Sequence, residues 1–151
     1  MTRVLVLIKG LGRGGAEQLA VGTLRHLDPA RMECEVAYLL PGKDALADEV
    51  RAMGIKVHCL GSGADWPMRL RTLARHRGID VVHAHSPVAA SAARVLLKGP
   101  HLYTEHNTWP RYRRPTRLAN LLTYPRNAHV LAVSNSGETS TLSSMPNNLA
   151  K

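Results

Sequence analysis

Residues 4–15, with the sequence VLVLIKGLGRGG, decide the fold of this chain. An unbroken apolar run such as residues 4–8 is typical of a strand buried on both faces, in a parallel sheet that helices cover on both sides. The glycines that follow indicate a tight turn. Beyond the turn, apolar residues recur at steps of four and three, which is the spacing of a helix with one apolar face: Ala16, Ala20, Leu24 and Leu27. The stretch therefore predicts a strand, a glycine-rich turn and a helix.

The glycine-rich turn is a candidate anion-binding site. Glycine lets the backbone come close to a ligand, and the unpaired N–H groups where the helix starts, at Gly14 and Gly15, favour a phosphate. A second interpretation gives these glycines only the geometry of a tight strand-to-helix turn, without a ligand.

The same turn also satisfies the G-x-G-x-x-G pattern of dinucleotide-binding proteins, through Gly10, Gly12 and Gly15. Such a site needs an acidic residue at the end of the second strand to hold the ribose. The second predicted strand, residues 32–40, ends in Leu-Leu, and its two glutamates come too early in it. A dinucleotide-dependent oxidoreductase is therefore a disfavoured alternative.

The rest of the chain alternates between strand-like and helix-like segments. Strands are predicted at residues 4–8, 32–40, 55–60, 80–85, 101–105 and 129–133, and helices at residues 16–27, 45–53, 66–76, 88–98 and 115–124. This alternation predicts an α/β fold, a doubly wound parallel sheet of Rossmann-like type. A length of 151 residues suits one domain and is short for two. We expect the domain to cover residues 1–136, followed by a poorly defined tail over residues 137–151.

Net charge is the unusual bulk property, at +9. It indicates an anionic partner, and an anionic membrane surface or a phosphorylated substrate fits this charge. The low aromatic content, 4%, argues against stacking on single-stranded nucleic acid. Two arginine clusters carry much of the charge, and a merely solvated surface is the alternative for each: Arg69, Arg71, Arg75 and Arg77 on a predicted helix, and Arg111, Arg113, Arg114 and Arg117 around a loop.

The N-terminus leads directly into the first strand instead of a signal peptide, and no apolar run approaches the ~20 residues of a membrane span. We expect a cytoplasmic protein that can lie peripherally on the inner face of the membrane.

Polar residues follow several of the predicted strands where each strand ends. In open parallel sheets, ligands bind outside the carboxyl ends of the strands, where the strand order reverses, here between the first and fourth strands. The candidates at this edge are His83, His85 and Ser86, then Glu105, His106 and Asn107, then Ser134 and Asn135. We interpret His83 as structural, and His85 and His106 as functional. Zinc binding by the three histidines is a minor alternative, because no Cys-x-x-Cys or His-Glu-x-x-His motif accompanies them.

Four motifs together resemble the N-terminal half of GT-B glycosyltransferases, in particular the retaining family 4, or group 1, enzymes. They occur in the family's order and approximate spacing: GGAE at residues 14–17, VVHAHS at 81–86, YTEHN at 103–107 and AVS at 132–134. The resemblance implies that this half shapes the acceptor side of a cleft. It further implies a catalytic role for His106 near the reacting sugar, and substrate-binding roles for Gly14, Gly15, His85, Ser86 and Asn107, with the two glycines at the donor diphosphate.

The resemblance implies transfer of a sugar from a UDP- or GDP-linked donor to a lipid-linked, envelope or small-molecule acceptor. The nucleotide-sugar is then a substrate, so no cofactor and no metal are expected. A second Rossmann-like half, which carries a glutamate pair and a basic pair in the family, is missing, so we expect a truncated chain that is inactive alone. Strand alternation points Glu105 away from the side of His106, so Glu105 receives no catalytic role. A basic peripheral-membrane binding module remains an alternative.

Overall fold

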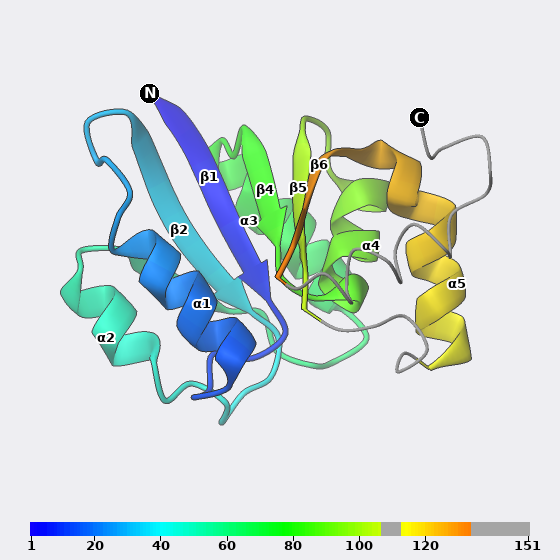
Figure 1. Ribbon diagram of the computed structural model, residues 1–151, viewed down its shortest axis with the longest axis horizontal. Helices are drawn as coiled ribbons and strands as arrows, with labels where there is room; N and C mark the ends of the chain where they lie inside the picture. Colours follow the sequence, from blue (N-terminus) through cyan, green and yellow to red (C-terminus); the bar gives the residue numbers. More distant parts are fainter. Residues whose placement is uncertain (107–112, 134–151) are drawn as a thin grey trace.

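The computed structural model describes residues 1–106 and 113–133, and they form a six-stranded sheet between two layers of helices (Figure 1). All neighbouring strands are parallel, in the order β3-β2-β1-β4-β5-β6. The strands are β1 (Thr2–Ile8), β2 (Met32–Tyr38), β3 (Lys56–Cys59), β4 (Val81–Ala84), β5 (His101–Glu105) and β6 (Asn127–Ala132). The predicted doubly wound α/β fold is confirmed, with the strand order reversing between β1 and β4.

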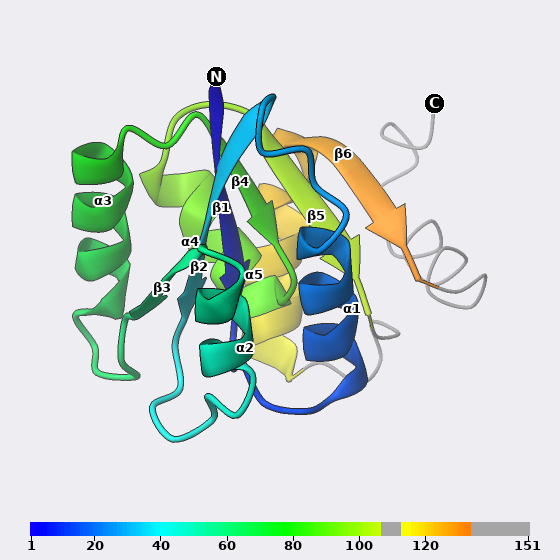
Figure 2. The ribbon, with the colours of Figure 1, turned by 90° about the vertical axis from the view of Figure 1, so that its left-hand side faces the viewer.

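Helices connect successive strands, and they lie in two layers (Figure 2). They are α1 (Gly15–Leu24), α2 (Ala47–Ala52), α3 (Trp66–Arg77), α4 (Pro87–Leu96), α5 (Arg114–Thr123) and the short 3₁₀ helix η2 (Tyr124–Arg126). The apolar clusters show that α1 and α2 cover one face of the sheet, while α3, α4 and α5 cover the other.

The first strand is buried on both faces, as its sequence predicts. Leu5 and Leu7 belong to the cluster under α3 and α4, whereas Val6 and Ile8 belong to the cluster under α1 and α2. This alternation follows from the two-residue period of a strand. Because β1 pairs with both β2 and β4, it is a central strand, and every side chain from residue 5 to residue 8 contributes to a core.

Several helices begin or end at residue types that are typical of helix ends. Gly54 and Gly78 have φ values of +78° and +61°, which is the left-handed conformation that ends a helix at glycine. Pro87 opens α4, and the Oγ of Ser86 accepts a hydrogen bond from the Ala89 N–H at 3.4 Å. At the start of α3, Asp65 is of a residue type that favours helix caps, but its carboxylate makes no capping hydrogen bond and binds the Arg69 side chain instead.

The first helix is shorter than its apolar spacing predicts. It ends at Leu24, and Leu27 packs against the same core from the segment that follows. The predicted domain boundary at residue 136, the tail over residues 137–151 and the side chain of Asn107 all lie outside the described residues.

Candidate functional site

A pocket of about 360 Å³ opens at the carboxyl edge of the sheet, where β1 leads to α1 on one face and β4 leads to α4 on the other. This is the position at which open α/β sheets bind their ligands. We call it the carboxyl-edge pocket. Its lining residues are Ile8, Lys9, Ala16, Glu17, His85, Ser86, Pro87, Val88, His106, Arg113 and Thr116.

The first turns of three helices meet at this pocket. Ala16 and Glu17 belong to α1, Pro87 and Val88 to α4, and Thr116 to α5. The first N–H groups of a helix have no partner within the helix, and its dipole places partial positive charge there. Neither α1 nor α5 has a side-chain hydrogen bond at its cap. Two helix starts therefore keep backbone donors that can bind an anion.

Charged side chains add to this field. Lys9 follows β1 and Arg113 is the N-cap residue of α5, so two cations line the pocket. Glu17 is the acid among the lining residues of the described chain. Its carboxylate folds back over the turn, since a Cβ built on Gly14 would lie 2.5 Å from Glu17 Oε2. The charges of the pocket favour an anionic ligand.

Three imidazole rings lie in a row beside the pocket. His83 and His85 have ring centroids 4.3 Å apart, and His85 and His106 have ring centroids 5.3 Å apart. His85 Nδ1 and His106 Nε2 are hydrogen-bonded at 3.1 Å. At the far end, His83 Nε2 is hydrogen-bonded to Thr104 Oγ1 at 2.7 Å. The row runs from the half-buried His83 through the buried His85 to His106 at the pocket.

Burial disfavours the charged form of each ring. Burial, then the neighbouring His83 and His106, lowers the pKa of His85 to about 3. The pKa of His83 is lowered by burial and by His106. Burial also lowers the pKa of His106, although Glu17 opposes that shift. Of the three, His106 is the ring with an acid beside it that favours its protonated form.

The structure brings together several of the residues predicted at this edge. His85, Ser86 and His106 all line the pocket, whereas His83 is hydrogen-bonded to Thr104 and is not among the lining residues. His85 is only 5% exposed, so it meets the pocket through little of its surface. Ser86 is buried and its hydroxyl caps α4.

The predicted glycines lie immediately before pocket residues. Gly14 is the N-cap of α1 and Gly15 its first residue, and both precede Ala16 and Glu17. A Cβ built on Gly15 meets no atom within 4 Å, so the space above it is open. Such space is what a ligand that approaches the backbone would need.

Sequence reasoning missed Lys9, Glu17 and Arg113 as pocket residues. Lys9 directly follows β1, and Glu17 lies in the first turn of the helix after the glycines. Both positions could have been found from the rule that the edge at the carboxyl ends of the strands holds the ligand. Arg113 had been grouped with surface arginines, and only the packing of α5 shows that it faces the pocket.

Glu105 points away from the pocket, as strand alternation predicts. It is 1% exposed, and its Oε1 accepts a hydrogen bond from the Tyr103 hydroxyl at 3.0 Å. In residues 1–106 and 113–133, no group of three His, Cys, Asp or Glu side chains is arranged to hold a metal ion.

The second strand supplies no acid for a dinucleotide ribose. Glu35 lies in the middle of β2, where it accepts hydrogen bonds from Arg77 at 2.7 Å and His58 at 2.7 Å. Burial by itself raises the pKa of Glu35, but Arg77 and His58 outweigh it and the pKa is lowered. This carboxylate joins β2, β3 and α3 and lies away from the glycine-rich turn.

Among the helices of the described ranges, none has the length and apolar character needed to cross a membrane.

Comparisons with solved structures find the same fold in other proteins. The Anabaena protein HepE in complex with UDP matches with a TM-score of 0.79 and 18% identity, over 99% of this chain and 43% of that one. The lipopolysaccharide outer core galactosyltransferase WaaB matches with a TM-score of 0.74 and 11% identity, over 95% of this chain and 42% of that one. The UDP-GlcNAc 2-epimerase from Neisseria meningitidis bound to UDP-GlcNAc matches with a TM-score of 0.66 and 18% identity, over 98% of this chain and 45% of that one.

This chain therefore spans less than half the length of these similar proteins and corresponds to one domain of a GT-B architecture. No curated protein sequence matches it. The model of glycosyltransferase family 4 matches residues 13–143, which is most of the chain. The chain belongs to glycosyltransferase family 4.

Proposed function

We propose that this chain is the acceptor-side domain of a retaining glycosyltransferase that moves a sugar from a nucleotide-sugar donor to a lipid-linked, envelope or small-molecule acceptor. The observation that carries the proposal is the carboxyl-edge pocket, where helix starts, two cations and His106 meet in a member of family 4. HepE and the Neisseria epimerase were solved with ligands that contain UDP. That favours a UDP-linked donor over a GDP-linked one.

In this proposal the donor diphosphate lies against the turn at Gly14 and Gly15. The open space above Gly15 lets phosphate oxygens reach the backbone N–H groups of α1. The same N–H groups stabilise the charge that develops on the leaving diphosphate, and Lys9 and Arg113 add positive charge. Binding and charge stabilisation then come from one set of donors.

His106 positions and polarises the reacting groups. It is half-buried, it faces the pocket, and its ring is fixed by the hydrogen bond to His85. Holding a reacting group in one orientation supplies a large share of a catalysed rate. Asn107 and Ser86 are proposed to contact substrate beside it, Ser86 through its backbone because its hydroxyl caps α4.

The proposal is tested first on the chain as it stands. Adding millimolar UDP to ¹⁵N-labelled protein should shift the amide signals of Gly15, Ala16 and His106 more than that of His76, which lies on α3. Equal shifts at both places, or none, would contradict a donor site at this edge.

The second test measures transfer. Joined to the donor half of another family 4 enzyme, the domain should support sugar transfer, whereas the 151-residue chain alone should not. The expectation follows because the chain spans about 43% of HepE, and positioning requires both sides of a cleft. Turnover by the isolated chain would refute the expectation that the 151-residue chain alone is inactive.

We also propose a peripheral contact with anionic membrane, but through fewer arginines than the sequence suggests. Arg69 binds Asp65, and Arg77 binds Glu35, so these two cations are paired. Arg114 and Arg117 are exposed at the start of α5, Arg113 lines the carboxyl-edge pocket, and Arg111 lies outside the described residues. The two predicted clusters are therefore not two uniform basic surfaces.

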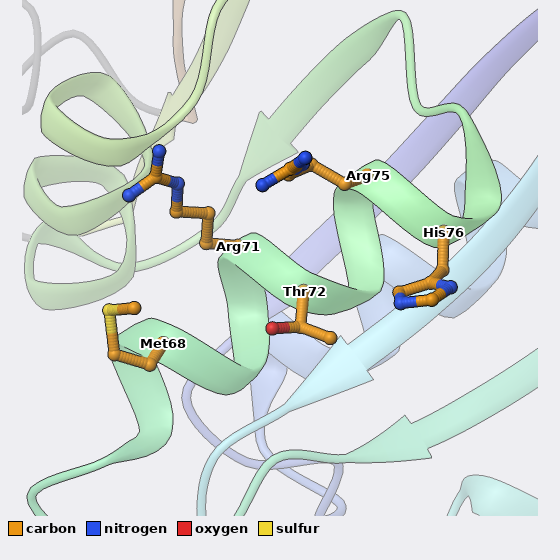
Figure 3. Close-up of a pocket in the computed structure, with 5 residues that line it drawn as sticks. All are labelled: Met68, Arg71, Thr72, Arg75 and His76. Carbon is orange, nitrogen blue, oxygen red and sulfur yellow. The ribbon is translucent and has the colours of Figure 1, made fainter.

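Arg71 and Arg75 remain as the candidate membrane contacts. Both extend from the same side of α3 (Figure 3), and neither takes part in an ion pair within the described chain. With Lys98 they line a groove of about 510 Å³ whose apolar lining residues include Ile79, Leu96 and Leu97. Met68 and Val95, on the helices beside this groove, are 56% and 60% exposed. Cations next to exposed apolar side chains suit an anionic lipid surface.

Vesicle binding tests this contact. Replacing Arg71 and Arg75 with Glu should abolish binding to phosphatidylglycerol vesicles, and wild-type binding should fall as salt rises. The control is the change of Arg25 and Arg51 to Glu, which alters net charge equally on exposed residues elsewhere. Equal loss in both variants, or equal binding to phosphatidylcholine, would exclude a specific lipid surface.

A further inference from the structure

The hydrogen bond between His85 and His106 determines which atom of His106 a ligand can meet. His106 Nε2 is engaged by His85 Nδ1 at 3.1 Å. The other ring nitrogen of His106, Nδ1, has no hydrogen bond within residues 1–106 and 113–133. His106 lines the carboxyl-edge pocket, so Nδ1 is the nitrogen available there.

His85 is held more firmly than the ring it contacts. Its backbone N–H donates to the Leu7 carbonyl at 2.9 Å, which continues the pairing of β4 with β1. Its ring lies between those of His83 and His106, and His83 is fixed by Thr104. With only 5% of its surface exposed, His85 has little space in which to turn.

A single proton forms the hydrogen bond between His85 Nδ1 and His106 Nε2, so one ring donates and the other accepts. If His106 gains a proton, both of its nitrogens carry hydrogen, so Nε2–H can only donate and His85 Nδ1 must accept. Glu17 favours that protonated form, and an anion in the pocket favours it further, whereas Lys9 and Arg113 oppose it. His85 stays neutral, because burial and its histidine neighbours lower its pKa to about 3. An accepting His85 suits both charge states of His106 without rearrangement.

We propose that His85 is a positioning residue that accepts the hydrogen bond from His106 Nε2–H and so presents His106 Nδ1 to the ligand. Neutral His106 then offers an acceptor lone pair for a substrate hydroxyl, and protonated His106 offers an N–H donor for a phosphate. The identity of that ligand rests on the proposed function, but the tautomer and its cause do not. His85, which the sequence suggests as a substrate-binding residue, acts in this proposal through His106.

The test is the ¹⁵N spectrum of the imidazole nitrogens in the 151-residue chain without ligand. His106 should show hydrogen on Nε2 and a lone pair on Nδ1, with its signals identified by their loss in His106→Gln. Hydrogen on Nδ1 of neutral His106 would overturn the proposal, and this wild-type measurement decides it even if no His85 variant folds.

Two variants of His85 distinguish the effect of losing its acceptor atom from the effect of losing its imidazole ring. His85→Asn keeps an acceptor oxygen close to the position of Nδ1, whereas His85→Leu keeps an apolar side chain of related size without one. We expect His106 to keep its tautomer in His85→Asn and to populate both tautomers in His85→Leu. An unchanged tautomer in a folded His85→Leu protein would contradict the proposal.

Transfer by the domain joined to a donor half adds a functional measurement. His85→Leu should lower kcat on the order of tenfold or more with a smaller change in KM, and His85→Asn should recover most of it. If no form transfers sugar while the tautomers behave as expected, the proposed function fails and the positioning role stands. If transfer occurs but His85→Leu leaves kcat unchanged, the positioning role fails instead.

Discussion

Within residues 1–106 and 113–133, one polar cluster lies at the carboxyl edge and another lies between α4, α5 and β6. The first is the row of His83, His85 and His106. The second surrounds Arg94, which is 2% exposed and donates to Asn120 Oδ1 at 2.7 Å and Asn127 Oδ1 at 2.8 Å. Both clusters place polar groups in a largely apolar interior, where a buried polar group without a hydrogen bond costs free energy.

The clusters differ in where their contacts end. Arg94 also donates to Thr123 Oγ1, and its guanidinium lies 4.9 Å and 5.5 Å from the ring centroids of Tyr103 and Tyr124. These contacts join α4 to α5, β5 and β6. In the histidine row, by contrast, His106 lines the carboxyl-edge pocket. The comparison teaches that burial and polarity alone do not mark a candidate functional residue, and that its place in the lining of the pocket has to be considered as well.

The Arg94 cluster gives the largest expected effect on stability. Arg94→Met should lower the free energy of unfolding by about 3 kcal/mol, because it leaves buried acceptors on Asn120 and Asn127 without a donor. Urea denaturation measures this. The control Arg25→Met removes one exposed ion pair with Glu49 and should cost less than about 1 kcal/mol. A similar loss of unfolding free energy in both variants would contradict the structural role assigned to Arg94.

The histidine row should show the opposite behaviour. In the domain joined to a donor half, His106→Ala should reduce turnover by about 10²-fold, because it removes the group that we propose to position the reacting sugar. Its stability should fall by no more than about 1 kcal/mol. Val82→Ala is the matched comparison, since it truncates a core side chain that is 3% exposed and should mainly destabilise. Full activity in His106→Ala would refute the assignment.

Acid should affect the two clusters differently. The folded pKa values of His83 and His85 lie below the ordinary value of 6.5 because burial disfavours their charged forms. Their contribution to stability is therefore complete above about pH 6.5 and is lost as pH falls from there towards about pH 3. Between pH 7 and pH 5 we expect a loss on the order of 1–2 kcal/mol, measured by urea denaturation at each pH.

His85→Leu should remove part of this pH dependence. The contacts of Arg94 should persist from pH 7 to pH 5, because burial lowers the pKa of Arg94 only to about 10 and the guanidinium stays charged over this range. A stability profile that is flat from pH 7 to pH 5 in the wild-type chain would contradict the neutral state of the row.

The smallest expected effect on stability comes from two glycines of α1, one at the open turn and one further along the helix. Gly15 and Gly22 both lie in α1, and a Cβ built on either meets no atom within 4 Å. Gly15→Ala and Gly22→Ala should each stabilise α1 by up to about 1 kcal/mol, since alanine favours helix. Only Gly15→Ala should weaken UDP binding, followed by the amide shifts described above. Equal affinities in both variants would show that the turn does not contact the ligand.

The sequence determined the architecture to a large extent. The unbroken apolar run at residues 4–8 indicated a central strand, and the strand over residues 101–105 was predicted with its observed bounds. Ser86, Pro87 and Gly78 are residue types typical of helix ends, and helix ends lie at these positions. Such features follow from local chemistry, because side-chain periodicity and cap residues act within a few positions of the chain.

The sequence also placed His85 and His106 at one edge, because parallel strands end on the same side. Only the tertiary structure decided that these two rings bond to each other, that Arg113 reaches the pocket from α5, and that Arg77 is paired with Glu35. Each of these contacts joins segments far apart in the chain. Its geometry depends on how the helices pack on the sheet and which way each side chain turns, and no local pattern encodes that.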